Sequence, residues 1–320
     1  MHSGEYWLVT VLGLGITAFG LIGIAAFMVF AERRILGLLQ DRLGPNRAGP
    51  FGILQPIADA LKLLTKENFL PPFAERPLYR LAPVLVPLAA LLSFVVVPVA
   101  PGWSWAGDLN VALLFIFAMS SISAYGVFLG GWASNSKYSL LGSLRGIAQL
   151  ISYELSMALA IMGVVMLTGS FSLEKIVVAQ HLPYALLQPL GLVIFFICGV
   201  AETNRLPFDL PEAENELVAG YNTEYGGVRF ALFFLGEYLG ILLIAALTVS
   251  LFLGGWRGPV LPGVVWFFIK LVAVVFVFFW IRTSLPRLRY DQLMAFGWKG
   301  LLPLALVNVL VTALVGMAWM

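Results

Sequence analysis

Apolar runs of about twenty residues recur along this chain, and each matches the length of helix that crosses roughly 30 Å of bilayer hydrocarbon. Lipid offers the backbone no hydrogen-bond partner, so segments of this kind must be helical. Composition agrees, because 60% of the residues are hydrophobic and 11% are charged, whereas soluble domains carry about 25% charged residues. The sequence therefore predicts an all-α, polytopic integral membrane protein.

The runs predict eight transmembrane helices in one membrane domain that covers residues 1–320. We place the spans near residues 7–30, 81–100, 110–132, 144–168, 185–203, 230–253, 262–282 and 300–319. Most of the 19 Lys and Arg residues fall in the odd-numbered connections. By the positive-inside rule these connections face the cytoplasm, or the matrix in a mitochondrion.

The first connection holds a segment, residues 51–67, that is too short to span a membrane. Leu54, Ile57 and Leu61 recur at helical spacing, and Gln55 and Asp59 fall on the opposite face. This pattern predicts an amphipathic helix at the membrane interface. A solvated face is the simpler role for Asp59, and a functional carboxylate is the alternative.

The sequence excludes several classes of function. A net charge of +2 gives no support for a nucleic-acid partner. The single cysteine cannot form an internal disulfide, and His, Cys and acidic residues show no metal-ligand spacing, so no metal is expected. Glycine-rich phosphate-binding motifs are also absent from the sequence, which argues against a bound nucleotide.

Glu154, Glu202 and Glu237 lie within or at the end of predicted spans. An ionisable residue in the bilayer costs at least ~2.5–3.5 kcal/mol, so each needs a reason to be there. Pairing with a basic residue is one explanation and proton transfer is the other. Lys270 is the only basic residue deep in a predicted span and can neutralise at most one of them. We interpret these glutamates as candidate proton carriers.

The connection 204–229 is acidic, unlike the other connections on the same side. Its acids are Asp209, Glu212, Glu214, Glu216 and Glu224. Acids favour a helix N-terminus, but this role would explain only one or two of them. If residues 212–220 are helical, Glu212 and Glu216 share a face and repel each other.

Several motifs together resemble the H subunit of the proton-pumping NADH:quinone oxidoreductase, respiratory complex I, whose mitochondrial equivalent is NADH dehydrogenase subunit 1. The matching stretches are Glu32-Arg-Arg34, Gly44-Pro-Asn-Arg47, Gly52–Ala60, Gly131–Tyr138, Ser152-Tyr-Glu154, Arg205–Glu214, Glu224-Tyr225 and Arg287–Asp291. They extend over essentially the whole chain, and several are long and unusual.

The resemblance implies a subunit that is inactive alone and forms the membrane half of a quinone tunnel. The residues it assigns to the tunnel are Glu32, Arg33, Gln55, Asp59 and Arg205. Those it assigns to proton coupling are Asp59, Glu154, Glu202, Glu212, Glu214, Glu216 and Glu237. We expect quinone headgroup chemistry near Asp59 to change the charge of the acidic connection and thereby the protonation of the intramembrane glutamates.

The resemblance also implies partners and a location. Ubiquinone or menaquinone would be the substrate, with no tightly bound cofactor in this chain. FMN and iron–sulfur clusters would reside in hydrophilic subunits docked on the cytoplasmic loops, and small membrane subunits would lead to antiporter-like subunits. The location implied is the bacterial inner membrane, or the mitochondrial inner membrane for an organellar chain.

One position departs from the family pattern. Some relatives carry a glutamate in the third span where this chain has Ser121. A hydroxyl can relay a proton through water but cannot store one, so Ser121 and Tyr125 are weaker candidates for that link.

Two other functions remain open. A stand-alone proton-coupled transporter would also carry carboxylates in its spans, but transporters often show internal repeats, and none is evident here. A membrane anchor of a related energy-converting hydrogenase is the other. Copurification separates these alternatives, because a transporter would work alone and an anchor would bring a hydrogenase.

Overall fold

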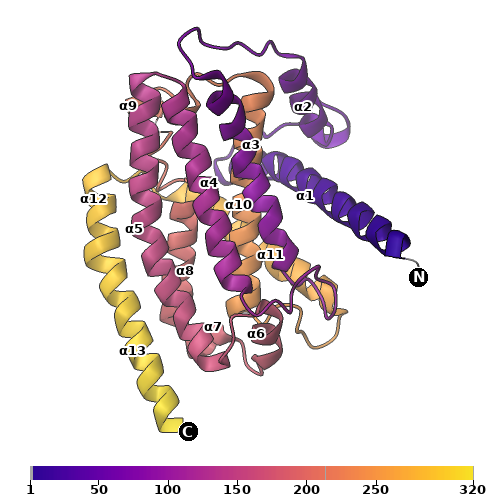
Figure 1. Ribbon diagram of the computed structural model, residues 1–320, viewed down its shortest axis with the longest axis vertical. Helices are drawn as coiled ribbons and strands as arrows, with labels where there is room; N and C mark the ends of the chain where they lie inside the picture. Colours follow the sequence, from indigo (N-terminus) through magenta and orange to yellow (C-terminus); the bar gives the residue numbers. More distant parts are fainter. Residues whose placement is uncertain (1–2, 213, 320) are drawn as a thin grey trace.

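The computed structural model describes residues 3–212 and 214–319, with side chains described for residues 10–212 and 216–316. The described chain is helical and contains no strand (Figure 1). The predicted all-α membrane fold is therefore confirmed. The long helices are α1 (Ser3–Leu39), α3 (Arg76–Ser93), α4 (Ala112–Ala133), α5 (Lys137–Thr168), α10 (Gly227–Phe252), α11 (Gly263–Ser284) and α13 (Leu302–Trp319).

Shorter elements connect these helices. They are α2 (Gln55–Thr65), α6 (Leu173–Ala179), α7 (Tyr184–Leu187), α8 (Pro189–Glu202), α9 (Glu214–Leu217) and α12 (Tyr290–Ala295), with single 3₁₀ turns at Pro50–Gly52, Phe94–Val96 and Gly220–Asn222. A π-helical turn, Phe296–Leu301, joins α12 to α13. Within the described residues, seven helices are long and apolar enough to cross a membrane, the last of them running through this turn as Tyr290–Gly316.

The predicted span at 185–203 is divided in the structure. Its first turn is α7 and the rest is α8, a helix of 14 residues. The break falls at Gln188, whose backbone adopts φ −133° and ψ 60°. Pro189 follows directly, and a residue before proline is pushed out of the helical conformation. This segment is therefore shorter than the seven long helices, and a count of eight spans stays a prediction.

Helix α10 lies inside the bundle, and most of its residues from Gly236 onward are buried. Small residues let its neighbours approach closely. A Cβ added to Gly236 would lie 2.6 Å from Val86 of α3. On another side, Ile244 of α10 packs directly against Gly199 of α8. In Figure 1, α1 leaves this bundle obliquely, and its N-terminal half projects away from the other helices.

The polar segments singled out from the sequence lie at one end of the molecule. Figure 1 places α2 and α9 at this end, and α6 and α7 at the opposite end with the C-terminus. The first connection returns from α1 to α2, and the acidic connection returns from α8 to α10. The fold therefore brings the first and the acidic connections to the same end of the bundle.

Lys270 does not pair with any carboxylate in the described part of the chain. Its ammonium donates to the carbonyls of Leu253 at 2.7 Å, Gly255 at 3.0 Å and Arg257 at 2.7 Å. These carbonyls follow the end of α10, where helical acceptors lack partners. Lys270 thus has a structural role, and the intramembrane glutamates are left to other partners.

Candidate functional site

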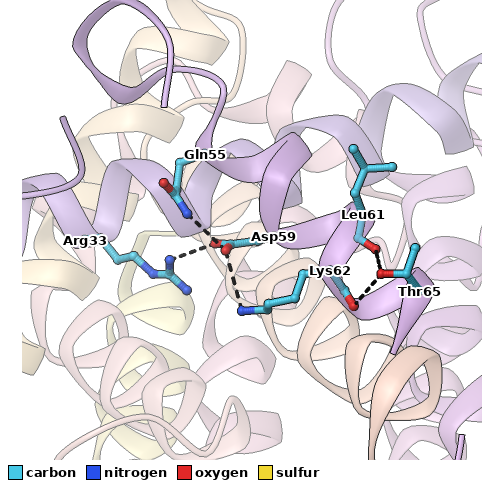
Figure 2. Close-up of polar contacts among 6 residues, drawn as sticks. All are labelled: Arg33, Gln55, Asp59, Leu61, Lys62 and Thr65. Carbon is cyan, nitrogen blue, oxygen red and sulfur yellow. Dashed lines mark hydrogen bonds and ion pairs between the residues drawn. The ribbon is translucent and has the colours of Figure 1, made fainter. Parts of the chain in front are cut away.

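Asp59 on α2 is the centre of a cluster of polar side chains that joins α2 to α1 (Figure 2). Arg33 donates from Nη1 to Oδ2 of Asp59 at 2.7 Å, and Gln55 donates from Nε2 to Oδ1 at 3.1 Å. Lys62 approaches Oδ1 to 3.7 Å. The Asp59 side chain is 21% exposed, so it is reached from outside yet held by three donors. We call Arg33, Gln55, Asp59 and Lys62 the Asp59 cluster.

A second group of charges lies buried where α1, α10, α11 and the acidic connection meet. Arg205 lies 3.2 Å from Oε2 of Glu237 and 3.9 Å from Oε1 of Glu32. Arg282 of α11 forms an ion pair with Glu32 from its other side. Glu32 is 2% exposed and Glu237 is 8% exposed. Charges this deep are tolerated only when they are paired, and here acids and bases alternate.

Arg205 also packs against aromatic rings of α10. Its guanidinium carbon lies 4.4 Å from the centre of the Tyr238 ring and 5.9 Å from that of Phe234, within the range of a cation–π interaction. Burial alone would lower the pKa of Arg205, but the carboxylate of Glu237 outweighs burial and raises it. Arg205 is therefore a fixed positive charge.

The acidic connection places Glu212 beside Glu237. Asn222 donates to Oε1 of Glu212 at 2.8 Å, and Tyr221 donates to Oε1 of Glu237 at 3.0 Å. Burial and the neighbouring carboxylate of Glu237 raise the pKa of Glu212 well above its usual range, against the opposite effect of Arg205. We call Glu32, Arg205, Glu212, Glu237 and Arg282 the buried charge cluster, and Glu212 is the member that holds a proton most readily.

The anticipated repulsion between Glu212 and Glu216 does not arise, because Glu212 lies in a turn and α9 begins only at Glu214. Glu216 points outward and pairs with Arg145 of α5 at 2.5 Å. Asp209 pairs with Arg287 at 2.6 Å. The side chain of Glu214 lies outside the described residues.

Glu202 and Glu154 have serine partners on α4. Ser120 donates to Glu202, and Ser121 donates to Glu154 at 3.4 Å. A cavity of about 70 Å³ has both Glu202 and Glu237 in its lining, together with Ser120, Ser123 and Tyr221. Since a water molecule occupies about 30 Å³ in the liquid, the cavity has room for water between the two carboxyls.

The structure brings together most of the residues singled out from the sequence. Asp59, Arg33 and Gln55 form one cluster, while Glu32, Arg205, Glu212 and Glu237 belong to the other. Glu202 and Glu154 lie on separate serines, and Glu216 is directed away. Tyr125, weighed from the sequence, is 64% exposed and lies outside both clusters.

Four contributors escaped the sequence reasoning, namely Ser120, Tyr221, Asn222 and Arg282. Ser120 precedes the flagged Ser121, and Arg282 lies at the edge of a predicted span, where an arginine is typical of an interfacial anchor. Tyr221 and Asn222 follow the acidic stretch directly. A search for hydroxyl and amide groups near the flagged acids could have found three of them, whereas the position of Arg282 depends on how α11 packs on α1.

A helical membrane protein with ionisable groups buried among its spans belongs to the class that handles charge or protons within the bilayer. Comparison with known proteins makes this specific, because residues 12–313 match the NADH dehydrogenase family. The first of two NADH-quinone oxidoreductase H subunits named for Geobacter metallireducens is 57% identical over 303 residues, which cover 92% of each chain. The second H subunit of the same enzyme from Syntrophobacter fumaroxidans is 56% identical over 96% of this chain and 95% of its own.

The chain therefore belongs to the NADH dehydrogenase family. The resemblance drawn from the sequence motifs is confirmed over most of the chain.

Proposed function

We propose that this chain is the membrane subunit of a proton-translocating NADH:quinone oxidoreductase that meets quinone at the Asp59 cluster and transmits charge through the buried charge cluster. One observation carries this proposal. Glu32 and Arg33 are consecutive residues of α1, yet Arg33 binds Asp59 while Glu32 binds Arg205 and Arg282. A change of charge at Asp59 therefore acts on the buried cluster across a single residue step.

The Asp59 cluster suits a lipid-soluble substrate with a polar headgroup. Arg33, Gln55 and Lys62 are hydrogen-bond donors gathered on one side of α2. Ile57 and Leu61 lie on the same helix and are 58% and 57% exposed. Donors of this kind can bind quinone carbonyl oxygens while the apolar side chains face the isoprenoid tail.

The buried charge cluster can exchange a proton because its charges do not balance when every acid is ionised. It holds three carboxyl groups against the two guanidinium groups of Arg205 and Arg282. One proton shared by Glu212 and Glu237 restores neutrality. A new negative charge at the Asp59 cluster favours uptake of that proton, and its loss favours release.

The onward route follows the cavity. Glu237 and Glu202 both line it, and water in the cavity would connect them. Glu202 and Glu154 then meet the adjacent hydroxyls of Ser120 and Ser121 on α4. In our proposal these two serines relay protons where some relatives have a storing carboxylate. Glu214 stays a candidate from the sequence alone.

Partners belong to the same proposal. Exposed ion pairs such as Glu216–Arg145 and Asp291–Arg289 offer charges to hydrophilic subunits that would carry FMN and iron–sulfur clusters. Small membrane subunits would continue the path toward antiporter-like subunits. The bacterial inner membrane is the location this assembly requires, or the mitochondrial inner membrane for an organellar chain.

Asp59→Ala tests the quinone end. We expect NADH oxidation by membranes to fall at least about tenfold with quinone, because a positioned proton-transfer group contributes roughly 10²-fold or more. Oxidation by a soluble artificial acceptor should be unchanged, because that electron path would lie in the partner subunits. Loss of both activities would make Asp59 structural and remove support for a quinone site. Retention of both would place Asp59 on a merely solvated face.

Asp209→Asn tests the acidic connection through pH. Burial and the nearby Glu212 raise the pKa of Asp209 to about 6, although Arg287 opposes them. The ion pair with Arg287 is therefore intact above about pH 6 and is lost as pH falls through 6. We expect wild-type quinone-linked activity to decline over this interval, and the variant to be lower but flat. The pH profile measures this, with acceptor-linked activity as the control; an identical acid limb in both proteins would refute it.

A further inference from the structure

The two consecutive arginines at the end of α1 contact different elements. Arg33 reaches α2 and binds Asp59. Arg34 is half-buried, and its Nη1 donates to two backbone carbonyls of the connection, Phe51 at 2.9 Å and Pro45 at 3.3 Å. Successive helical residues point about 100° apart, so one helix end holds both the connection and α2.

The connection between α1 and α2 lies close against the end of α1. A Cβ on Gly37 would lie 2.8 Å from the carbonyl oxygen of Arg42, and one on Gly44 would lie 3.0 Å from Cα of Arg34. Backbone contacts this close leave no room for the segment to shift without losing its packing. The path from α1 to Phe51 is therefore defined by contacts around Arg34.

Phe51 is the point at which the connection turns into α2. It has φ 55°, a left-handed conformation that a non-glycine residue keeps only when its surroundings hold it. Gly52 follows with φ 82°, and α2 begins at Gln55. The bond from Arg34 to the Phe51 carbonyl fixes this turn, so it fixes where α2 starts.

We infer that Arg34 is a positioning residue for the quinone site, because it anchors the turn that sets α2, and hence Asp59, opposite Arg33. This inference rests on the proposed function of the Asp59 cluster. The acceptors of Arg34 are backbone carbonyls of the connection, and they belong neither to Asp59 nor to the buried charge cluster. Its loss should therefore change how well quinone is held rather than the proton transfer that follows.

Arg34→Ala in the intact complex should raise the KM for quinone about tenfold, the loss expected when a charged donor is removed from its acceptors. The kcat at saturating quinone should stay within about twofold of wild type, and acceptor-linked NADH oxidation should be unchanged. Arg34→Lys, which keeps a cationic donor, should return the KM to near wild type. Gly52→Ala disturbs the same turn by another route, because its Cβ would collide with Pro45, and should reproduce the KM effect.

Three results would overturn the inference. They are an unchanged KM in Arg34→Ala, a fall in kcat without a change in KM, and a parallel loss of acceptor-linked activity in Arg34→Ala and Arg34→Lys. Asp59→Ala separates this failure from failure of the proposed function. If Asp59→Ala lowers quinone turnover while Arg34→Ala does not alter KM, the quinone site stands and only the role of Arg34 falls. If Asp59→Ala has no effect, the proposed function falls first.

Discussion

Arg205→Met is expected to remove most of the assembled complex from the membrane. The guanidinium of Arg205 is the nearest positive charge to Glu237 and also approaches Glu32. Removing one partner of a buried ion pair costs about 3–5 kcal/mol, because the other charge stays buried without compensation. That cost is a large fraction of the stability of a typical domain, roughly 5–15 kcal/mol. The measurement is acceptor-linked NADH oxidation per milligram of washed membranes.

A second variant separates the charge from the side chain. Arg205→Met combined with Glu237→Gln removes both partners, and Glu32 still has Arg282. We expect the double variant to recover much of the assembled complex but little quinone-linked activity. Arg205→Lys keeps the charge but lacks the planar fork that two carboxylates and the Tyr238 ring require, so its effect should be intermediate. Full assembly of Arg205→Met alone would show that the buried charge cluster is not paired as described.

Glu212→Gln is expected to lower quinone-linked turnover at least about tenfold while the complex remains assembled, since a proton carrier typically contributes roughly 10²-fold or more. The amide keeps the size of the side chain and can still accept from Asn222, but it cannot gain or lose a proton. Because the pKa of Glu212 is raised by burial and by Glu237, the native residue carries a proton near neutral pH, and the neutral amide mimics that form.

The matched control for Glu212→Gln is Glu67→Gln, which removes an exposed carboxylate from the segment after α2. Quinone-linked and acceptor-linked activities should both stay within about twofold of wild type in this control, as expected for an exposed charge. Equal losses in the two variants would mean that general surface charge, rather than the buried position of Glu212, explains the effect.

Much of this fold follows from hydrophobic runs and their breakers. The long spans, the amphipathic α2 and the acidic connection are local features, and the apolar runs predict the spans because each satisfies its own backbone. The division at Gln188 is less visible, since the run from 185 to 203 is largely apolar and only Pro189 marks the break. The sequence also left open whether Lys270 pairs with an acid, and its contacts with the end of α10 depend on tertiary packing.

The candidate site is predictable in its members but not in its pairing. The cost of burying charge singles out Glu202 and Glu237 from sequence alone. No local rule, however, indicates that Glu32 meets Arg282 or that Arg205 lies between Glu32 and Glu237. These pairs join residues from α1, α10, α11 and the acidic connection, so they exist only once the helices pack. The same holds for the cavity that connects Glu237 to Glu202.

The central claim is that quinone chemistry at the Asp59 cluster changes the protonation of the Glu212–Glu237 pair. Infrared difference spectroscopy of the intact complex, recorded between oxidised and quinone-reduced states, tests it most directly. We predict a carboxylic-acid C=O band that changes on reduction in the wild type, is absent in Glu212→Gln and persists in Glu67→Gln. A band that is unchanged in Glu212→Gln would contradict the claim and would place the proton elsewhere in the complex.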